Sequence, residues 1–209
     1  MVGQEYYPGP SNDIDWTTRG GVSRVKNQGQ CGSCWAFSGT GAMESRALIG
    51  GMKDIDLSEQ QLVDCAKPDN YGCSGGWSYK TFIYTVANGL ASQSEYPYTG
   101  VDGNCARQGG SFKIAGYNFY NGCPAIADQL TALPVSVTVD ASNWSFYRVG
   151  IFSNCGTNTN HAVLLVGVVG GDWKIKNSWG TSWGENGFIR LLGQGNTCGI
   201  CQWSGFTPY

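Results

Sequence analysis

Two cysteines three positions apart, Cys31 and Cys34, are the residues of this sequence best suited to chemistry. They lie in a glycine-rich segment, Gln-Gly-Gln-Cys-Gly-Ser-Cys-Trp-Ala-Phe over 28–37, and an apolar stretch that can be helical follows directly. A cysteine at a helix start feels the positive end of the helix dipole and unpaired backbone N–H groups, which both favour the thiolate. Cys34 is therefore the predicted nucleophile, and Cys31, in the glycine turn, is better placed for a disulfide.

A nucleophilic cysteine needs a base, and the chain contains one histidine, His161, far downstream of Cys34. The two side chains must therefore meet through the fold rather than through the local sequence. Further on, Asn177 begins the segment Asn-Ser-Trp-Gly. It offers an amide that can orient an imidazole, and Trp179 can cover that hydrogen bond.

These motifs resemble those of the papain-like cysteine peptidases, above all the cathepsin L-like endopeptidases, over nearly the whole chain. The resemblance implies peptide-bond hydrolysis through a thioester on Cys34, with His161 moving the proton and Asn177 fixing the imidazole. Gln28 matches the glutamine of the oxyanion hole, which it would form together with the backbone N–H of Cys34.

Helical patterns dominate the first half of the chain and short apolar strands the second half, which predicts an α+β fold. The resemblance implies one papain-like domain over 1–209. Its helical lobe would cover about 11–115 and its antiparallel, barrel-like β lobe about 116–209, with the N-terminal segment crossing to the β lobe. Cys34 and His161 would then face each other across the cleft between the lobes. The predicted helices are 34–49, about 58–65, 79–88 and 124–133, and the predicted strands are 112–120, 135–139, 162–169, 173–176 and 187–192.

The resemblance also assigns a substrate cleft. Gly75 and Gly76 would pair with the substrate through main-chain hydrogen bonds, and Tyr71 would line the third subsite. The second subsite is assigned the residues Trp77, Ser78, Thr138, Asn160, Ala162 and Trp203. Trp203 would form its floor. This pocket is mostly apolar and holds no acid, so a hydrophobic or aromatic residue is expected at P2 and arginine should be accepted poorly. Asn160 stands where many relatives have aspartate, which can alter the acid limb of the pH profile.

Nine cysteines point to the secretory route, and their odd number fits disulfide pairs plus one reactive thiol. The resemblance pairs Cys31 with Cys73, Cys65 with Cys105, and Cys155 with either Cys198 or Cys201. The state of Cys123 and of the remaining C-terminal cysteine stays open, because sequence does not supply distances. Asn143-Trp144-Ser145 is the one N-glycosylation sequon.

The net charge is −2 and no Lys/Arg cluster occurs, so a nucleic-acid partner is not expected. No apolar run approaches the length of a membrane span. The resemblance implies a monomer without metal or cofactor that acts on peptide and protein substrates and meets its own propeptide and cystatin-type inhibitors. The expected location is lysosomal, endosomal or secreted. The sequence looks like a mature domain whose signal peptide and propeptide are absent.

Two other functions compete with this interpretation. A non-catalytic relative would keep the fold for binding, but such relatives usually lose the nucleophile, which is present here. A thiol–disulfide oxidoreductase would use Cys31 and Cys34 as a C-x-x-C pair, but no βαβ pattern surrounds the motif.

Overall fold

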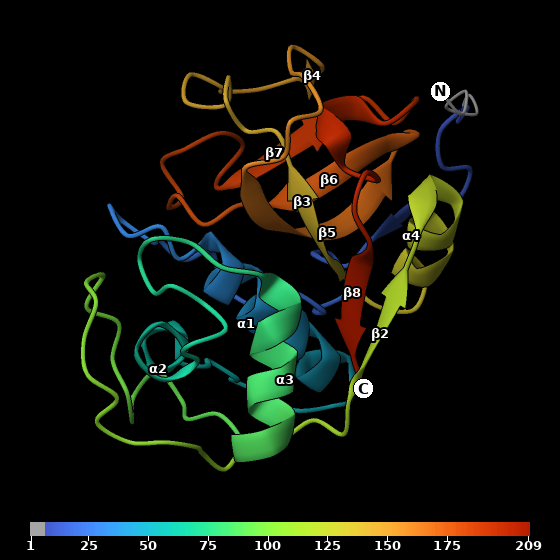
Figure 1. Cartoon of the computed structure of the whole chain (residues 1–209). Coiled ribbons are helices and arrows are strands. Elements are labelled where there is room, and N and C mark those ends of the chain that lie inside the picture. Colours follow the sequence, from blue (N-terminus) through green and yellow to red (C-terminus); the bar gives the residue numbers. More distant parts are fainter. Residues whose placement is uncertain (1–6) are drawn as a thin grey trace.

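The structure, a computed structural model, describes residues 7–209 and packs a group of helices against a twisted sheet (Figure 1). The three helices of the first half are α1 (Cys34–Ile49), α2 (Glu59–Cys65) and α3 (Ser78–Asn88). A fourth helix, α4 (Gly122–Leu130), lies beside the sheet, and a 3₁₀ turn, η1 (Thr197–Gly199), precedes the last strand. Within residues 7–209, no helix has the length and apolar character that crossing a bilayer requires.

The strands are β1 (Ile14–Asp15), β2 (Tyr117–Tyr120), β3 (Val135–Val139), β4 (Ile151–Phe152), β5 (His161–Val169), β6 (Asp172–Lys176), β7 (Phe188–Leu191) and β8 (Gly205–Pro208). They form one sheet in the order β2-β8-β3-β5-β6-β7-β4, and β1 pairs with β5. All pairings are antiparallel except that of β4 with β7. Because β2 and β4 lie at opposite ends of this order, the sheet is open, and the barrel-like description holds only loosely.

Most of the expected elements occur, with shifted ends. The strand expected over 112–120 begins only at Tyr117, because Phe112 instead forms a bridge with Leu90 next to α3. The strands β1 and β4 are two residues long, too short to produce a sequence periodicity. β8 was also not predicted, since its glycine and proline are depleted in strands.

Helix α1 is the centre of the packing, because it contacts α2, α3 and strands β3, β5 and β8. Most of its residues are buried, including its glycines, serines and threonine. At Gly39 the helix approaches α3 so closely that an added Cβ would collide with Thr81. The small residues of α1 therefore allow it to be enclosed on several sides.

Strand β5 separates the two hydrophobic cores. Side chains alternate across a strand, so Leu164 and Val166 join the core among the helices, whereas Val163 and Leu165 join the core of the sheet. The residues from His161 to Val168 are all buried, as expected for a strand covered on both faces. β5 is therefore held in place from both sides.

A buried ion cluster fixes the segment that precedes Gln28. The Lys26 ammonium lies 2.7 Å from Glu44 in α1, 2.6 Å from Glu59 in α2 and 2.8 Å from Asp56. Burial raises the pKa of Glu59, and the positive charge of Lys26 opposes this rise. Lys26 thus connects its own segment to two helices and neutralises the fully buried carboxylates of Glu44 and Glu59.

Four disulfides complete the framework: Cys31–Cys73, Cys65–Cys105, Cys123–Cys201 and Cys155–Cys198. The structure thereby selects Cys198 as the partner of Cys155, and it pairs Cys123, whose state was open, with Cys201. Cys34 is the one free cysteine in the described part of the chain.

Replacing Lys26 with methionine should lower the free energy of unfolding at neutral pH by about 3–5 kcal/mol, because two buried carboxylates lose their counter-ion. The loss should shrink as the pH falls, since protonation removes the uncompensated charges. Denaturant titration at several pH values measures both effects. The control is Lys174→Met, which removes a partly exposed ion pair with Asp15 and should cost at most about 1 kcal/mol. Equal losses in the two variants would contradict this account.

Candidate active site

Cys34 is the first residue of α1, where the helix leaves backbone N–H groups without partners. The N-cap residue Ser33 makes no side-chain cap. The backbone N–H groups of Ala162 in β5 and of Trp35 and Cys34 in the helix favour the thiolate and act to lower the pKa of the Cys34 thiol. This thiol is partly exposed and lies at a helix N-terminus.

His161 is the first residue of β5 and pairs with Val139 of β3. Its Nε2 lies 2.7 Å from Oδ1 of Asn177, the residue that follows β6. The same oxygen accepts the backbone N–H of Ser178 at 2.8 Å, which identifies it as the carbonyl oxygen of the amide. Nε2 therefore donates, and the other ring nitrogen, Nδ1, is left with the lone pair of a base.

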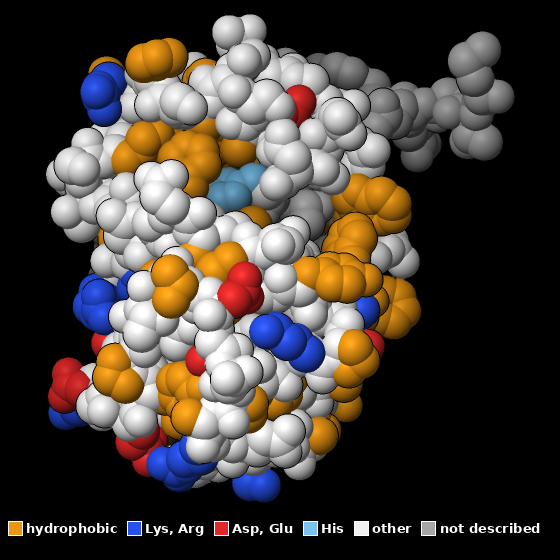
Figure 2. Space-filling model, turned by 60° about the vertical axis from the view of Figure 1, so that its left-hand side comes forward, with side chains coloured by type: hydrophobic (Ala, Val, Ile, Leu, Met, Phe, Trp, Pro, Cys, Tyr) orange, Lys and Arg blue, Asp and Glu red, His pale blue; other side chains and the backbone are white. Residues whose placement is uncertain are grey.

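Tryptophans enclose the hydrogen bond between His161 and Asn177. The ring of Trp179 lies 5.0 Å from the imidazole at an angle of 33°, and Trp144 meets it edge-on at 6.2 Å. Trp183 packs on both of these tryptophans and donates its Nε1–H to the carbonyl of Trp144. His161 is 8% exposed, and Figure 2 shows the imidazole, pale blue, in a hollow of the surface beside hydrophobic side chains. Trp144 and Trp183 were not predicted as parts of the site.

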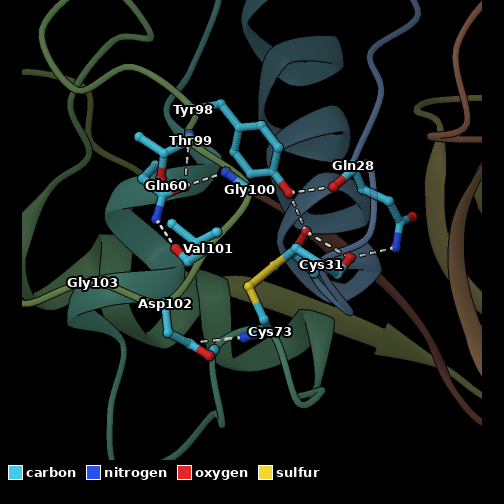
Figure 3. The surroundings of a disulfide bond; sticks show 12 residues. Gln28, Cys31, Gln60, Cys73, Tyr98, Thr99, Gly100, Val101, Asp102 and Gly103 are labelled. Carbon is cyan, nitrogen blue, oxygen red and sulfur yellow. Dashed lines mark hydrogen bonds between the residues drawn. A yellow bond between two sulfur atoms is a disulfide. The ribbon is translucent and has the colours of Figure 1, made fainter.

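Gln28 is buried and almost fully hydrogen-bonded. Its Oε1 accepts from the Ser178 hydroxyl at 2.6 Å, and its backbone N–H donates to the Ser178 carbonyl at 2.8 Å. Its Nε2 donates to the Cys31 carbonyl at 3.0 Å (Figure 3). Since an amide nitrogen carries two hydrogens, one N–H of Gln28 remains available to a ligand.

Burial opposes charge on both reacting groups. It raises the pKa of the Cys34 thiol, although the three surrounding N–H groups act in the opposite direction. It also lowers the pKa of His161 to about 4, against a smaller opposing effect of the hydrogen bond with Asn177. A proton moved from the thiol to the imidazole creates both charges together, and in a low-dielectric site their attraction is strong. Each charge therefore depends on the presence of the other.

The predicted second subsite corresponds in part to an open pocket of about 250 Å³. Four of the expected residues line it, namely Trp77, Ser78, Thr138 and Trp203, together with Tyr79, Ser136, Val137, Ser204 and Phe206. None of these nine residues is charged. Trp77 and Trp203 meet edge-on with ring centroids 6.2 Å apart, and Trp203 donates to the hydroxyl of Thr159 at 2.9 Å.

The other assigned cleft residues are distributed differently. Asn160 does not line this pocket, because its side chain binds the backbone N–H of Ala141 and the hydroxyl of Ser142. Ala162 borders a separate, small cavity beneath Asn177. Tyr71 is exposed, whereas Gly75 and Gly76 are half-buried, and Gly75 has a φ of 115° that favours glycine.

In residues 7–209 no three His, Cys, Asp or Glu side chains gather in a way that could hold a metal ion. The site consists instead of a thiol, an imidazole, two amides and a tryptophan cluster. These groups can form a nucleophile, move a proton and donate hydrogen bonds to a developing negative charge.

The single histidine makes the proposed proton transfer directly measurable. In a Cys34→Ser variant, the imidazole should titrate near pH 4, because burial lowers its pKa more than the hydrogen bond with Asn177 raises it, and no thiolate is present. With Cys34 intact, the midpoint should lie about two or more pH units higher, because a neighbouring thiolate stabilises the imidazolium. NMR of the imidazole C–H signals follows both titrations. The same midpoint in both proteins would show that the thiol and the imidazole do not share a proton.

Comparison with known proteins supports the same chemistry. Residues 10–205 match the family model described as "Papain family cysteine protease". Cathepsin L 2 of Paramecium tetraurelia is 50% identical over 198 residues, which are 90% of this chain and 62% of that protein. The chain thus spans less than two thirds of this relative's length.

Solved structures agree with the sequence comparison. The Carica candamarcensis cysteine protease in complex with E-64 superposes with a TM-score of 0.87 at 38% identity, covering 95% of this chain and 98% of that one. Procathepsin L2 from Tenebrio molitor gives 0.86 at 41% identity, covering 95% and 68%. Family model, sequence identity and superposition all span nearly the whole of this chain, which therefore belongs to the papain family of cysteine proteases, among its cathepsin L-like members.

Proposed function

We propose that this chain is a cysteine endopeptidase that hydrolyses peptide bonds through an acyl-enzyme on Cys34. The observation that carries the proposal is the position of the one free thiol. It lies at the N-terminus of α1, and the backbone N–H of Ala162 acts to lower its pKa. Ala162 directly follows His161, whose Nε2 is bound by Asn177. This arrangement supports the roles of nucleophile for Cys34, base for His161 and orienting group for Asn177.

In the acylation step, the Cys34 thiolate attacks the carbonyl carbon of the scissile bond, and the π electrons move to oxygen. His161, protonated at Nδ1, then gives its proton to the leaving amine as the C–N bond breaks. A thioester remains. In deacylation, His161 takes a proton from water, whose oxygen attacks the thioester carbonyl. The C–S bond then breaks, which releases the carboxylic acid and leaves Cys34 as thiolate and His161 as imidazolium, ready for the next cycle.

The oxyanion formed in each step needs donors that are already in place. The free N–H of the Gln28 amide and the backbone N–H of Cys34 are the proposed pair. Gln28 is suited to this role because its other polar groups are engaged, so its amide does not need to reorganise when charge develops.

The competing functions receive less support. An oxidoreductase using Cys31 and Cys34 would need these two cysteines as a pair, but Cys31 is bonded to Cys73. A non-catalytic binding relative would not need the hydrogen bond between His161 and Asn177. We prefer an endopeptidase to an exopeptidase, because no long insertion between Gln28 and Cys105 could occlude the cleft.

The uncharged pocket between Trp77 and Trp203 supports a preference for a hydrophobic or aromatic residue at P2. Two tryptophans and Phe206 offer aromatic surface, and a basic P2 side chain would find no counter-charge among the lining residues. The substrate strand would lie along Gly75 and Gly76. The carbonyl and N–H of Gly75 are bound to Tyr71 and Gly72 within the turn, so the main-chain groups of Gly76 are the ones proposed to pair with the substrate.

We further propose a secreted or lysosomal location, peptide and protein substrates, and control by a propeptide and by cystatin-type inhibitors. Four disulfides support the secretory route. The Tenebrio molitor neighbour is a procathepsin, which supports an inhibitory propeptide for this chain as well.

Treating the reduced protein with an epoxysuccinyl peptide at about pH 5.5 should give one covalent adduct on Cys34, together with loss of cleavage of a Phe-Arg fluorogenic peptide. Intact-mass measurement and peptide mapping locate the adduct. Cys34→Ala should show neither adduct nor activity, whereas unfolding-sensitive fluorescence should remain unchanged. Folded wild-type protein that takes up no label would overturn the proposal in favour of a binding function.

Replacing Trp203 with alanine should lower kcat/KM about fivefold for peptides with phenylalanine at P2, because aromatic contact area is lost. Peptides with alanine at P2 should change less than about twofold. The matched control is Phe119→Ala, which removes an exposed aromatic side chain from β2. If Trp203→Ala reduced cleavage of both peptides equally, Trp203 would not belong to the P2 pocket.

A further inference from the structure

Tyr98 lies outside the residues considered so far, yet its hydroxyl connects two of the segments that form the site. It donates to the backbone carbonyl of Gln28 at 2.7 Å and lies 2.8 Å from the hydroxyl of Ser33 (Figure 3). Because the single proton of Tyr98 goes to the carbonyl, the Ser33 hydroxyl is the donor in the second bond. One tyrosine oxygen thus binds the residue of the oxyanion hole and the residue before the nucleophile.

This bond to Ser33 explains why the N-cap of α1 is unusual. A serine at this position normally accepts an N–H from the first turn of the helix, but Ser33 makes no such bond. Its hydroxyl instead lies 2.8 Å from the Tyr98 hydroxyl and 3.4 Å from the carbonyl of Cys31.

Tyr98 itself is held rigidly. Its ring meets Phe37 of α1 edge-on, with centroids 5.0 Å apart. The residues that follow it are bound by Gln60 of α2, whose Oε1 accepts from Thr99 and Gly100 and whose Nε2 donates to Val101.

The same segment also reaches the disulfide behind the catalytic turn. The carboxylate of Asp102 accepts the backbone N–H of Cys73, the disulfide partner of Cys31. Segment 98–102 therefore contacts the 28–34 turn directly through Tyr98 and indirectly through Asp102, which binds the disulfide partner of Cys31. Helix α2 holds the residues between these two.

From these contacts we propose that Tyr98 is a positioning residue for the oxyanion hole, acting through the backbone of Gln28. The inference rests on the proposed peptidase function. The Gln28 side chain is held by Ser178 and Cys31. The backbone carbonyl of Gln28 is held by the Tyr98 hydroxyl, and this contact fixes the position of the backbone from which the side-chain amide extends. Without the hydroxyl, the amide would lose the fixed geometry that transition-state stabilisation requires.

Tyr98→Phe tests this, because it removes the hydroxyl and keeps the ring against Phe37. We expect kcat for a fluorogenic peptide amide to fall about tenfold, with KM changed less than about twofold. The rate at which iodoacetamide alkylates Cys34 should stay within about twofold of wild type, because alkylation forms no oxyanion. Tyr84→Phe is the matched control. It removes a hydroxyl that accepts a backbone N–H from Gly109, and kcat should not change.

The decisive measurement combines Tyr98→Phe with Gln28→Ala. If Tyr98 acts through Gln28, it should add less than about a twofold further loss of kcat once the amide is gone. A tenfold loss in both backgrounds, an unchanged kcat in Tyr98→Phe, or a parallel fall in alkylation rate would each overturn the inference. Failure of the proposed function has a different signature, namely folded wild-type protein that neither cleaves the peptide nor reacts at Cys34.

Discussion

The site depends on the packing of helix α1 against strand β5. Cys34 is the first residue of the helix and His161 is the first residue of the strand, so the relative position of two rigid elements determines where thiol and imidazole lie. Leu164 and Val166 on one face of β5 and Val163 and Leu165 on the other anchor the strand in both cores. Catalytic groups carried by packed elements hold their geometry better than groups on free loops.

The same packing also changes the pKa values of Cys34 and His161. Enclosing Cys34 and His161 raises the pKa of the thiol and lowers that of the imidazole, so neither group would carry a charge alone. The backbone N–H groups of Ala162, Trp35 and Cys34 act to lower the pKa of the thiol, and the amide oxygen of Asn177 at Nε2 acts to raise that of the imidazole. In the proposed mechanism the two charges form together, and such a pair can remain reactive at a pH where an isolated thiol would stay protonated.

Polar contacts between distant segments hold the rest of the site. Lys26 neutralises carboxylates from two helices just before Gln28, and Ser178 binds both the side chain and the backbone of Gln28. Each of these bonds joins residues that belong to different parts of the chain. The 28–34 turn is therefore fixed by its surroundings, since glycines give it little rigidity of its own.

The sequence by itself determined the candidate nucleophile, base and orienting amide, because a thiol next to a helix start, a single histidine and the Asn-Ser-Trp-Gly segment are local signals. It also indicated α1, the buried strand β5 and the change from helices to strands, since apolar periodicity is a local property.

Only the tertiary structure decided contacts between residues far apart in the chain. It paired Cys155 with Cys198, and it turned Asn160 away from the pocket that Trp203 borders. It also brought Tyr98 to the carbonyl of Gln28. Such contacts depend on how complete helices and strands pack against each other. Residue types and their spacing in the sequence do not reveal the distance between segments that meet only after folding.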